Sequence, residues 1–317
     1  MNSFVLCVRD TMSDNNTFGI GMGPVSYLQV PDNITKPTPS HKIRLGKWFD
    51  NVISQAMAPN TPLDIIFFVH GYNTNAEEAL SHQRSIEDRL QQRGINCMVI
   101  GFDWPTAGSA LSYLYDRSQA ADAAIFLVKG GIVPFTKYTS NQCAITVHVM
   151  AHSMGGFVVR EAFRTVDKSR SSVSADNWRV GQVVLFAADL SSDCFALNSQ
   201  DMIPIINRCG RITNYFSGHD EALMVSNLKN LDVSSRLGRV GMPVETSAHK
   251  KALDVDCGPR YIASSVGKIP SIDGSHSWYF NDDVWYDDLA FTIQGTMDRS
   301  VIPTRAYIGV NDFILKE

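Results

Sequence analysis

One serine in this sequence stands between a segment with the composition of a buried strand and a segment with the periodicity of a helix. Residues 143–150 are short, apolar and rich in β-branched side chains, and Ala151-His152-Ser153-Met154-Gly155-Gly156 follows directly. Apolar residues then recur at helical spacing as far as Val166. A strand–serine–helix turn of this kind exposes a nucleophilic hydroxyl at a helix N-terminus, which favours negative charge. Ser153 is therefore the candidate nucleophile.

This turn also restricts the residues around the serine. The serine must adopt a positive φ, a strained conformation that costs about 1–3 kcal/mol. The residues two positions away on either side must be small, or their side chains would clash across the turn. Gly155 meets this need, and so does Ala151, although Gly is the commoner residue there. Because a chance turn between a strand and a helix would satisfy the same pattern, partners for Ser153 must be sought elsewhere.

In a fold with this turn, a carboxylate and then a histidine follow the serine along the chain. Three of the eight histidines come after the turn: His219, His249 and His276. His276 lies in residues 273–278, expected to be a flexible loop after the last core strand, whereas His249 stands in a polar stretch typical of a solvated surface. We therefore predict that His276 is the general base. The alternative is a histidine of a surface loop.

Asp220 is the candidate acid, because it follows an expected strand at 212–216. A carboxylate there can accept the Nδ1–H of the histidine, fix its tautomer and stabilise the imidazolium. Asp189 and Asp193, one strand earlier, are rivals for this role. The alternative for Asp220 is an N-cap of the next helix, a common position for aspartate.

The negative oxygen that forms during acyl transfer needs two backbone N–H donors. We expect one from Met154 and the other from Tyr72, which lies in the loop after the apolar strand at 63–69. Gly71 would let this loop approach the substrate, and we expect His70 to brace the loop. A simple turn is the alternative for this His-Gly pair.

Three large aromatic residues are candidates for the substrate pocket, and ordinary packing is the alternative for each: Trp104, Tyr113 and Trp278. Asp103 precedes Trp104, and a carboxylate there would be unusual beside a purely apolar pocket. We expect Asp103 to cap the helix that follows it.

The elements that must position these residues alternate between strands and helices. We expect strands at 4–8, 18–30, 63–69, 95–102, 143–150, 180–188, 212–216 and 260–266, with an edge strand at 306–310. Helices are expected near 48–56, after a capping box of Asn75 and Glu78, at 109–128 and after Ser153. This alternation predicts an α/β fold with a mostly parallel central sheet and helices on both faces. We expect one domain over residues 1–317, with 190–208 and 229–256 as candidate cap or lid segments.

The composition fits an enzyme domain and excludes several other classes. The 317 residues are 44% hydrophobic and 19% charged, with a net charge of −4, and no basic patch suggests nucleic-acid binding. No apolar run approaches the ~18 residues of a membrane span, and the N-terminus does not resemble a signal peptide. The six cysteines are dispersed without metal-ligand spacing. We expect reduced thiols, a cytoplasmic protein, and neither metal nor organic cofactor.

Several short motifs occur in a fixed order along the chain: His70-Gly71-Tyr72-Asn73, Trp104-Pro105, Tyr113 with Asp116, Ala151 to Gly156, Tyr215 to Leu223, Arg236-Leu237-Gly238 and His276. In this combination the chain resembles the bacterial alpha/beta hydrolases of unknown function in the esterase/lipase superfamily, from about residue 18 to about residue 280. The resemblance implies an alpha/beta-hydrolase fold and a triad of Ser153, Asp220 and His276. It implies no particular substrate.

Three functions remain open from the sequence. The leading one is a carboxylesterase that takes small or medium acyl esters through an acyl-enzyme. An acyltransferase or thioesterase would use the same triad with another acceptor, and a binding protein of the same fold would use no chemistry. A serine at the turn, where a dehalogenase has an aspartate, argues against dehalogenation. The expected partner is a small-molecule ester.

Overall fold

The computed structural model describes residues 2–57, 61–106, 113–140, 145–168, 177–229, 235–246, 248, 250–265, 267, 271–309 and 312–316. The strands in this part of the chain are β1 (Ser3–Thr11), β2 (Phe18–Val30), β3 (Lys42–Ile43), β4 (Asp64–Val69), β5 (Cys97–Asp103), β6 (Val147–His152), β7 (Val180–Phe186), β8 (Cys209–Phe216), β9 (Ala252–Asp256), β10 (Arg305–Gly309) and β11 (Asp312–Leu315). They form one sheet in the order β10-β11-β9-β8-β7-β6-β4-β5-β1-β2-β3. All neighbouring pairs from β1 through β5, β4, β6, β7, β8 and β9 to β11 are parallel.

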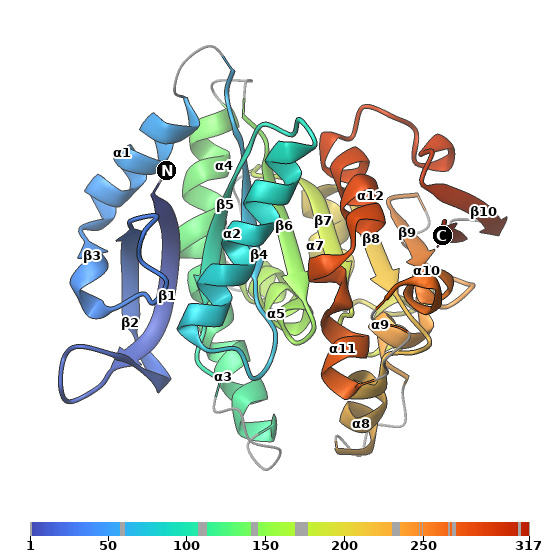
Figure 1. Cartoon of the computed structure of the whole chain (residues 1–317), viewed down its shortest axis with the longest axis horizontal. Helices are drawn as coiled ribbons and strands as arrows, with labels where there is room; N and C mark the ends of the chain where they lie inside the picture. The colour runs from blue at the N-terminus through green and yellow to red at the C-terminus, as the bar shows by residue number, and fades with distance from the viewer. Residues whose placement is uncertain are drawn as a thin grey trace.

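The helices connect these strands across both faces of the sheet (Figure 1). The longer ones are α1 (Leu45–Ala56), α2 (Ala76–Gln92), α3 (Tyr113–Phe126), α4 (Val133–Ser140), α5 (Gly155–Lys168), α8 (Glu221–Lys229) and α12 (Asp283–Gln294). The shorter ones are η1 (Pro39–His41), η2 (Leu127–Ile132), η3 (Ser192–Phe195), α7 (Ile203–Arg208), α9 (Leu237–Val240), α10 (Gly258–Ala263), α11 (Ile272–Ser277), η4 (Trp278–Asn281) and η5 (Arg299–Val301). Among the described helices, none is both long and apolar enough to cross a membrane.

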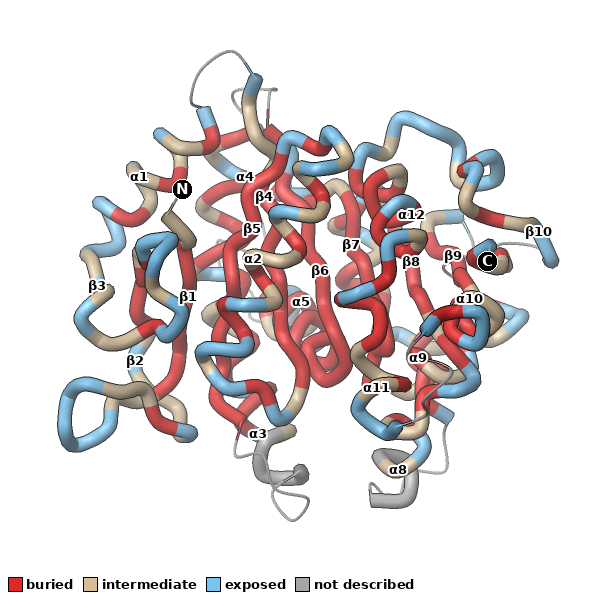
Figure 2. Tube along the Cα trace, viewed as in Figure 1, coloured by how far each residue is buried: buried red, intermediate tan, exposed pale blue. Residues whose placement is uncertain are grey.

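Alternation along β4 divides the interior into two hydrophobic cores. Ile65, Phe67 and Val69 face a core shared with α1, α3, α4, α5 and α7. Ile66 and Phe68 face a second core shared with α2, α10 and α12. Side chains of a strand alternate between the two faces, so a continuous apolar run serves both cores. β5 and β6 are consequently buried along their whole length, and β4 is buried at every position after Asp64 (Figure 2).

The register of the parallel strands brings the candidate site together at one edge of the sheet. Val69 of β4 pairs with Ala151 of β6, and His152 of β6 pairs with Phe186 of β7. Phe186 in turn pairs with Tyr215 of β8. The carboxyl ends of these four strands therefore lie side by side, and the segments that follow them converge there.

Several expected elements are confirmed. β2 has the predicted bounds, and α2 begins with the predicted capping box. Asn75 Oδ1 accepts bonds from the N–H groups of Glu77 and Glu78 at 3.0 Å, and Glu78 Oε2 accepts from Asn75 N. The edge strand near 306–310 is β10. The predicted helix at 109–128 is described from Tyr113 onward as α3, and its earlier part lies outside the described residues.

Two of the elements expected in the C-terminal half of the chain are wrong. The last core strand is β9, Ala252–Asp256, and residues 258–263 form the helix α10 where a strand was predicted. Pro259 lies in the first turn of α10, a position that suits proline because its missing N–H needs no partner there. His276 stands on the short helix α11, where a flexible loop was predicted.

The two candidate lid segments pack differently from a lid where they are described. In residues 190–208, the apolar side chains of Leu190, Phe195, Met202 and Ile205 are buried in the first core. Residues 229–256 include α9 and β9, and β9 is a member of the sheet; residues 230–234, 247 and 249 are outside the described part.

Candidate active site

Ser153 occupies a sharp turn between β6 and α5. Its φ is +53°, in the left-handed region predicted for a serine at such a turn. The turn is held on both sides, because Ser153 N donates to Phe186 O at 3.2 Å and Ser153 O accepts from Gly156 N and Asp189 N at 3.0 Å. The strain is thus offset by hydrogen bonds from neighbouring segments.

Small residues are required around this turn for reasons visible in the packing. A Cβ on Gly155 would overlap the carbonyl oxygen of Val69. Ala151 is fully buried within β6, between Val69 of β4 and Leu185 of β7, where its methyl group is accommodated. A Cβ on Gly71 would lie 2.8 Å from Ser153 Cβ. The loop after β4 therefore passes in direct contact with the serine, and that contact requires glycine.

Asp220 and His276 form a close pair. His276 Nδ1 donates to Asp220 Oδ2 at 2.7 Å, and the Asp220 side chain has 0% exposure. The other carboxylate oxygen, Oδ1, accepts from Leu223 N at 2.9 Å in the first turn of α8. Asp220 therefore caps a helix with one oxygen and holds the histidine with the other, so the two roles considered for it coexist.

The position of His276 has an electrostatic consequence. Burial lowers the pKa of His276, but the charge and hydrogen bond of Asp220 outweigh that effect and raise the pKa above its ordinary 6.5. With Nδ1 bound to Asp220, Nε2 is the ring nitrogen that can accept a further proton. This is the tautomer that a general base requires.

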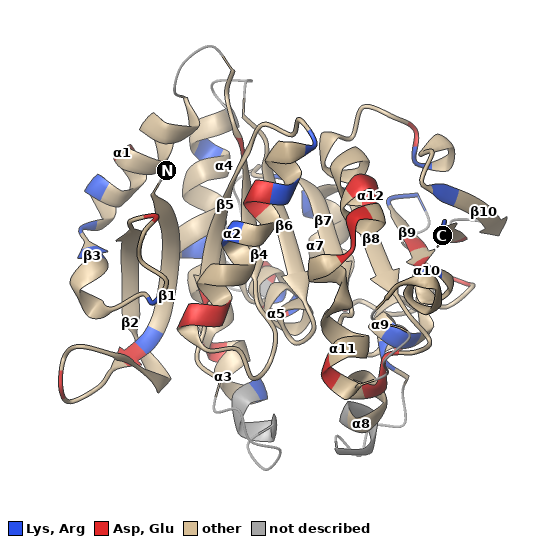
Figure 3. Cartoon of the chain, in the orientation of Figure 1, with Lys and Arg blue, Asp and Glu red and all other residues tan. Residues whose placement is uncertain are grey.

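Ser153 and His276 line one cavity of about 560 Å³. Its apolar wall consists of Ala222, Leu223, Val225 and Ile272, and its polar side includes Tyr72, Asn73, Thr74 and His82. Glu78, Asp189 and Asp273 also line it, and the described lining residues include neither lysine nor arginine. Acidic residues are also marked on α2 and α11 in Figure 3. The cavity therefore favours uncharged or cationic molecules over anionic ones.

A buried ionic network anchors the loop that contains Tyr72. Arg9 Nε donates to Asp103 Oδ1 at 2.7 Å, and Arg9 Nη2 donates to Thr74 O at 2.7 Å. His70 Nδ1 donates to Gly71 O at 2.9 Å, and His70 Nε2 lies 3.1 Å from Asp103 Oδ1. Burial raises the pKa of Asp103, but Arg9 and His70 outweigh it and lower that pKa to about 2. Asp103 is therefore an ionised anchor in the interior, where a helix cap was expected.

A match to a protein-family model agrees with this architecture. Residues 47–257 match the model of a family described as alpha/beta hydrolase of unknown function. The match covers more than half of the chain. This chain belongs to that family. No curated protein sequence matches it significantly.

Solved structures similar to this alpha/beta hydrolase share little sequence with it. Lipase B of Aspergillus fumigatus is 12% identical with a TM-score of 0.40, over 76% of this chain and 56% of the lipase. A gene product of Listeria innocua is 11% identical with a TM-score of 0.42, over 80% and 99% of the two chains. An esterase of Pyrobaculum calidifontis is 12% identical with a TM-score of 0.34, over 74% and 79%.

Of the three aromatic residues predicted for the pocket of this hydrolase, two lie away from the cavity, and the side chain of the third is outside the described part of the structure. Trp104 is fully buried, stacks on His70 at 5.5 Å and donates from Nε1 to His70 O at 2.9 Å. Trp278 is 1% exposed and packs against Tyr279 and Tyr261. Neither lines the cavity. Tyr113 begins α3, and its side chain is outside the described part.

The rival aspartates differ clearly from Asp220. Asp189 lines the cavity, and its carboxylate lies 3.3 Å from Nε of the fully buried Arg236. Its main chain supports the serine turn, as described above. Asp193 is in the first turn of η3, outside the cavity lining. His249, the rival base, lies outside the described residues.

Sequence reasoning assigned no role to four residues of this region: Arg9, His82, His152 and Arg236. His152 and Arg236 appeared there only as members of short motifs. Arg9 and Arg236 bear buried charges whose partners are distant in sequence. His82 stacks on Phe280 at 4.0 Å, and burial lowers its pKa to about 4, so it stays neutral at neutral pH. The only signal that could have found His152 is its place before the serine.

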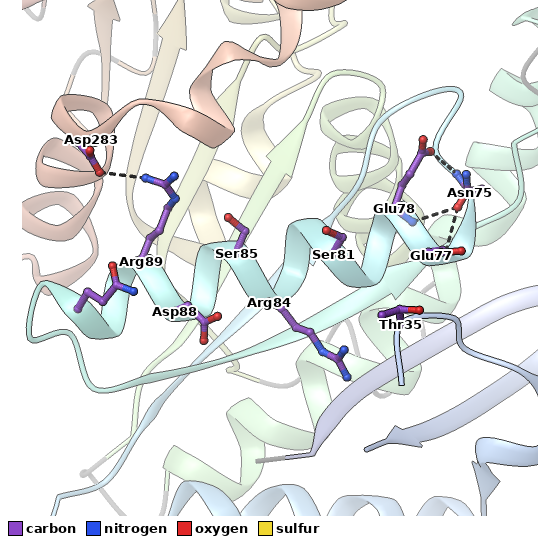
Figure 4. A pocket seen from close by; sticks show the side chains of 11 residues that line it. Thr35, Asn75, Glu77, Glu78, Ser81, Arg84, Ser85, Asp88, Arg89 and Asp283 are labelled. Atoms are coloured by element: carbon purple, nitrogen blue, oxygen red, sulfur yellow. Dashed lines mark hydrogen bonds and ion pairs between the residues drawn. The ribbon is translucent and has the colours of Figure 1, made fainter. Parts of the chain in front are cut away.

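A second, larger cavity of about 950 Å³ lies over the exposed face of α2 (Figure 4). Its charged side chains bind neighbouring segments: Arg84 donates to Ile34 O and Pro31 O, and Arg89 pairs with Asp283 at 2.9 Å. These contacts tie α2 to the 31–35 segment and to α12. The described residues hold no group of three or more His, Cys, Asp or Glu side chains arranged to bind a metal ion.

Proposed function

We propose that this alpha/beta hydrolase is a serine hydrolase that cleaves carboxylic esters with small or medium acyl groups. The observation that carries the proposal is the shared cavity: Ser153 and His276 line it together, while buried Asp220 holds the His276 ring at 2.7 Å. Nucleophile, base and orienting acid are the three parts that acyl transfer to serine requires.

In this mechanism, His276 Nε2 accepts the Ser153 hydroxyl proton while Oγ attacks the ester carbonyl carbon. The N–H groups of Met154 and Tyr72 stabilise the resulting oxyanion. The position of Met154, directly after Ser153 and directly before α5, supports this role. For Tyr72 the support is that it follows Gly71, which contacts the serine. His276 then gives its proton to the leaving alcohol, and a water molecule activated by the same nitrogen releases the acid from the acyl-enzyme.

The size and lining of the cavity support the substrate class. A volume of about 560 Å³ suits a small ester, and the short apolar wall on α8 and α11 suits an acyl chain of modest length. The polar side of the cavity can admit water, which favours hydrolysis over transfer to an organic acceptor.

The test is hydrolysis of p-nitrophenyl esters from acetate to palmitate, with wild type beside Ser153→Ala. We expect activity to peak at a short or medium chain and to fall by about 10⁴–10⁶-fold in the variant. Ser26→Ala is the matched control, because Ser26 is a buried serine on β2 outside the cavity lining. Wild-type turnover in Ser153→Ala would refute the proposal.

A fluorophosphonate reagent distinguishes the remaining outcomes. Such reagents phosphonylate an activated serine, so mass spectrometry should find one adduct on the peptide that contains Ser153 and none in Ser153→Ala. An adduct without ester turnover would indicate an acyltransferase, a thioesterase or a narrow substrate requirement. The absence of an adduct on folded protein would favour a binding protein.

A further inference from the structure

We propose that His152, the residue before the nucleophile, is a positioning residue that holds His276 in place through its main chain. This inference rests on the function proposed above for Ser153 and His276. His152 is the last residue of β6 and is 7% exposed. Its Nε2 lies 3.2 Å from the carbonyl oxygen of His276. A hydrogen bond therefore connects the neighbour of the nucleophile directly to the backbone of the base.

The direction of this hydrogen bond follows from its chemistry. A carbonyl oxygen can only accept, so His152 Nε2 must bear the proton and donate. Burial lowers the pKa of His152 well below its ordinary value, and the nearby His276 lowers it further. The ring is thus neutral at neutral pH, with its single proton on Nε2. The loop after β4 packs against the other nitrogen, since a Cβ on Gly71 would lie 3.0 Å from Nδ1.

Aromatic packing prevents the His152 ring from turning away from its acceptor. The ring centroid lies 4.9 Å from that of Phe186, 5.1 Å from Phe280 and 4.7 Å from His276. Three rings from β7, η4 and α11 therefore enclose it. A ring held in this way donates with little loss of conformational freedom at the time of reaction, which is the benefit of preorganisation.

His276 is consequently held at two separate points. Asp220 binds the ring through Nδ1, and His152 binds the main chain through the carbonyl oxygen. The second contact matters because α11 is only six residues long. The Asp220 contact and the bond from Glu221 N to Ser275 Oγ at 3.1 Å both join α11 to the start of α8, whereas the His152 contact joins α11 to β6. Asp220 alone would orient the ring, whereas the His152 contact sets the distance between β6 and α11. That distance determines how far the Ser153 hydroxyl, the proton donor, lies from His276 Nε2, the proton acceptor.

The experiment compares His152→Phe with His152→Gln. Phenylalanine keeps the ring in its aromatic enclosure but has no donor, whereas the glutamine amide can place an N–H near the position of Nε2. Active sites are titrated to completion with a fluorophosphonate, and kcat and KM are measured per titrated site on an ester that wild type hydrolyses. Because a misplacement of about 1 Å costs on the order of 10²-fold in rate, we expect kcat of His152→Phe to fall by about 10–100-fold. KM should change little, and His152→Gln should recover most of kcat.

His148→Phe is the matched control. His148 lies on the same strand, is also buried and accepts from Gln182 N at 3.0 Å, but it is not among the residues that line the cavity. A loss of stability without a positioning role would lower the number of titrated sites and leave kcat per site unchanged. We expect that behaviour from His148→Phe and not from His152→Phe.

Wild-type kcat per site in His152→Phe, or equal kcat in His152→Phe and His152→Gln, would overturn the inference. If His152→Phe does not fold, His152→Asn replaces it, because its shorter amide cannot reach the carbonyl; equal kcat in the Asn and Gln variants would then overturn the inference. A wild type that is neither labelled nor active would overturn the proposed function itself, before any variant is compared.

Discussion

Replacement of Asp220 by asparagine tests the proposed triad at its most buried member. Asp220 uses both oxygens: Oδ1 accepts from Leu223 N at 2.9 Å and Oδ2 accepts from His276 Nδ1 at 2.7 Å. Asparagine has one oxygen and one NH₂ group. If the oxygen keeps the helix cap, the NH₂ group faces Nδ1, which must then give up its proton and accept. The proton moves to Nε2, and His276 can no longer take a proton from Ser153.

The magnitude follows from this change of tautomer. The wrong tautomer at an otherwise intact triad lowers kcat by about 10⁴-fold, equivalent to about 5.4 kcal/mol of transition-state stabilisation. Because the cap to Leu223 survives and the two side chains have the same shape, we expect the stability of the fold to change by less than the ~3–5 kcal/mol that follows from breaking a buried ion pair.

The assay is kcat per mole of folded protein, with the folded fraction and the stability taken from thermal unfolding of the same samples. Asp189→Asn is the control, since Asp189 also lines the cavity and is buried, but its carboxylate lies beside Arg236. We expect Asp189→Asn to lower the thermal stability clearly and to change kcat little. Asp220→Asn within tenfold of wild type, together with a severe loss in Asp189→Asn, would refute the reasoning and transfer the acid role to Asp189.

Three further outcomes are expected. The pKa of His276 is raised above 6.5, so kcat/KM should fall as the pH drops through that raised value, and an acid limb below 6.5 in a pH–rate profile would contradict this. The stability that His276 contributes is complete below about pH 6.5 and is lost as the pH rises through the pKa of the folded state. Gly71→Ala should lower kcat because its Cβ would lie 2.8 Å from Ser153 Cβ, an overpacking that costs about 1–3 kcal/mol; unchanged kinetics would show that the loop can move aside. Arg9→Met should lower the free energy of unfolding by about 3–5 kcal/mol in urea titrations, because it leaves the Asp103 charge buried without its cation; a loss below 1 kcal/mol would contradict this.

The features that sequence predicted well are those with local causes. The bounds of β2 follow from its extended, Gly-rich composition up to Pro31, and the start of α2 follows from the Asn75–Glu78 capping box. The positive φ of Ser153 follows from small neighbours between a strand and a helix. In each case a few adjacent residues are sufficient to determine the backbone, because turn and cap chemistry acts over three or four positions.

The last core strand, which was predicted at 260–266 but is β9, shows the limit of predictions from local sequence. β9 contains Asp254, and a carboxylate in a short segment indicates a solvated surface. In the fold, Asp254 is 2% exposed and accepts from Asn214 Nδ2 at 2.7 Å and from Met242 N. Burial raises the pKa of Asp254 to about 7. Two partners from other parts of the chain thus make a buried carboxylate tolerable, and neither is visible in the local pattern.

The same argument explains why Asp103 was difficult to interpret and why it matters. A carboxylate at the end of a central strand costs several kcal/mol unless a cation accompanies it, and that cation is Arg9, on a strand 94 positions earlier. Once paired, Arg9 has a second N–H group free to bind Thr74 O, so one buried ion pair fixes both ends of the loop that contains Gly71 and Tyr72. Because buried ionic contacts fix its ends, this loop can lie close to Ser153 and keep its position there. The polar residue that seemed out of place beside an apolar pocket is therefore what keeps the proposed oxyanion donor at its position.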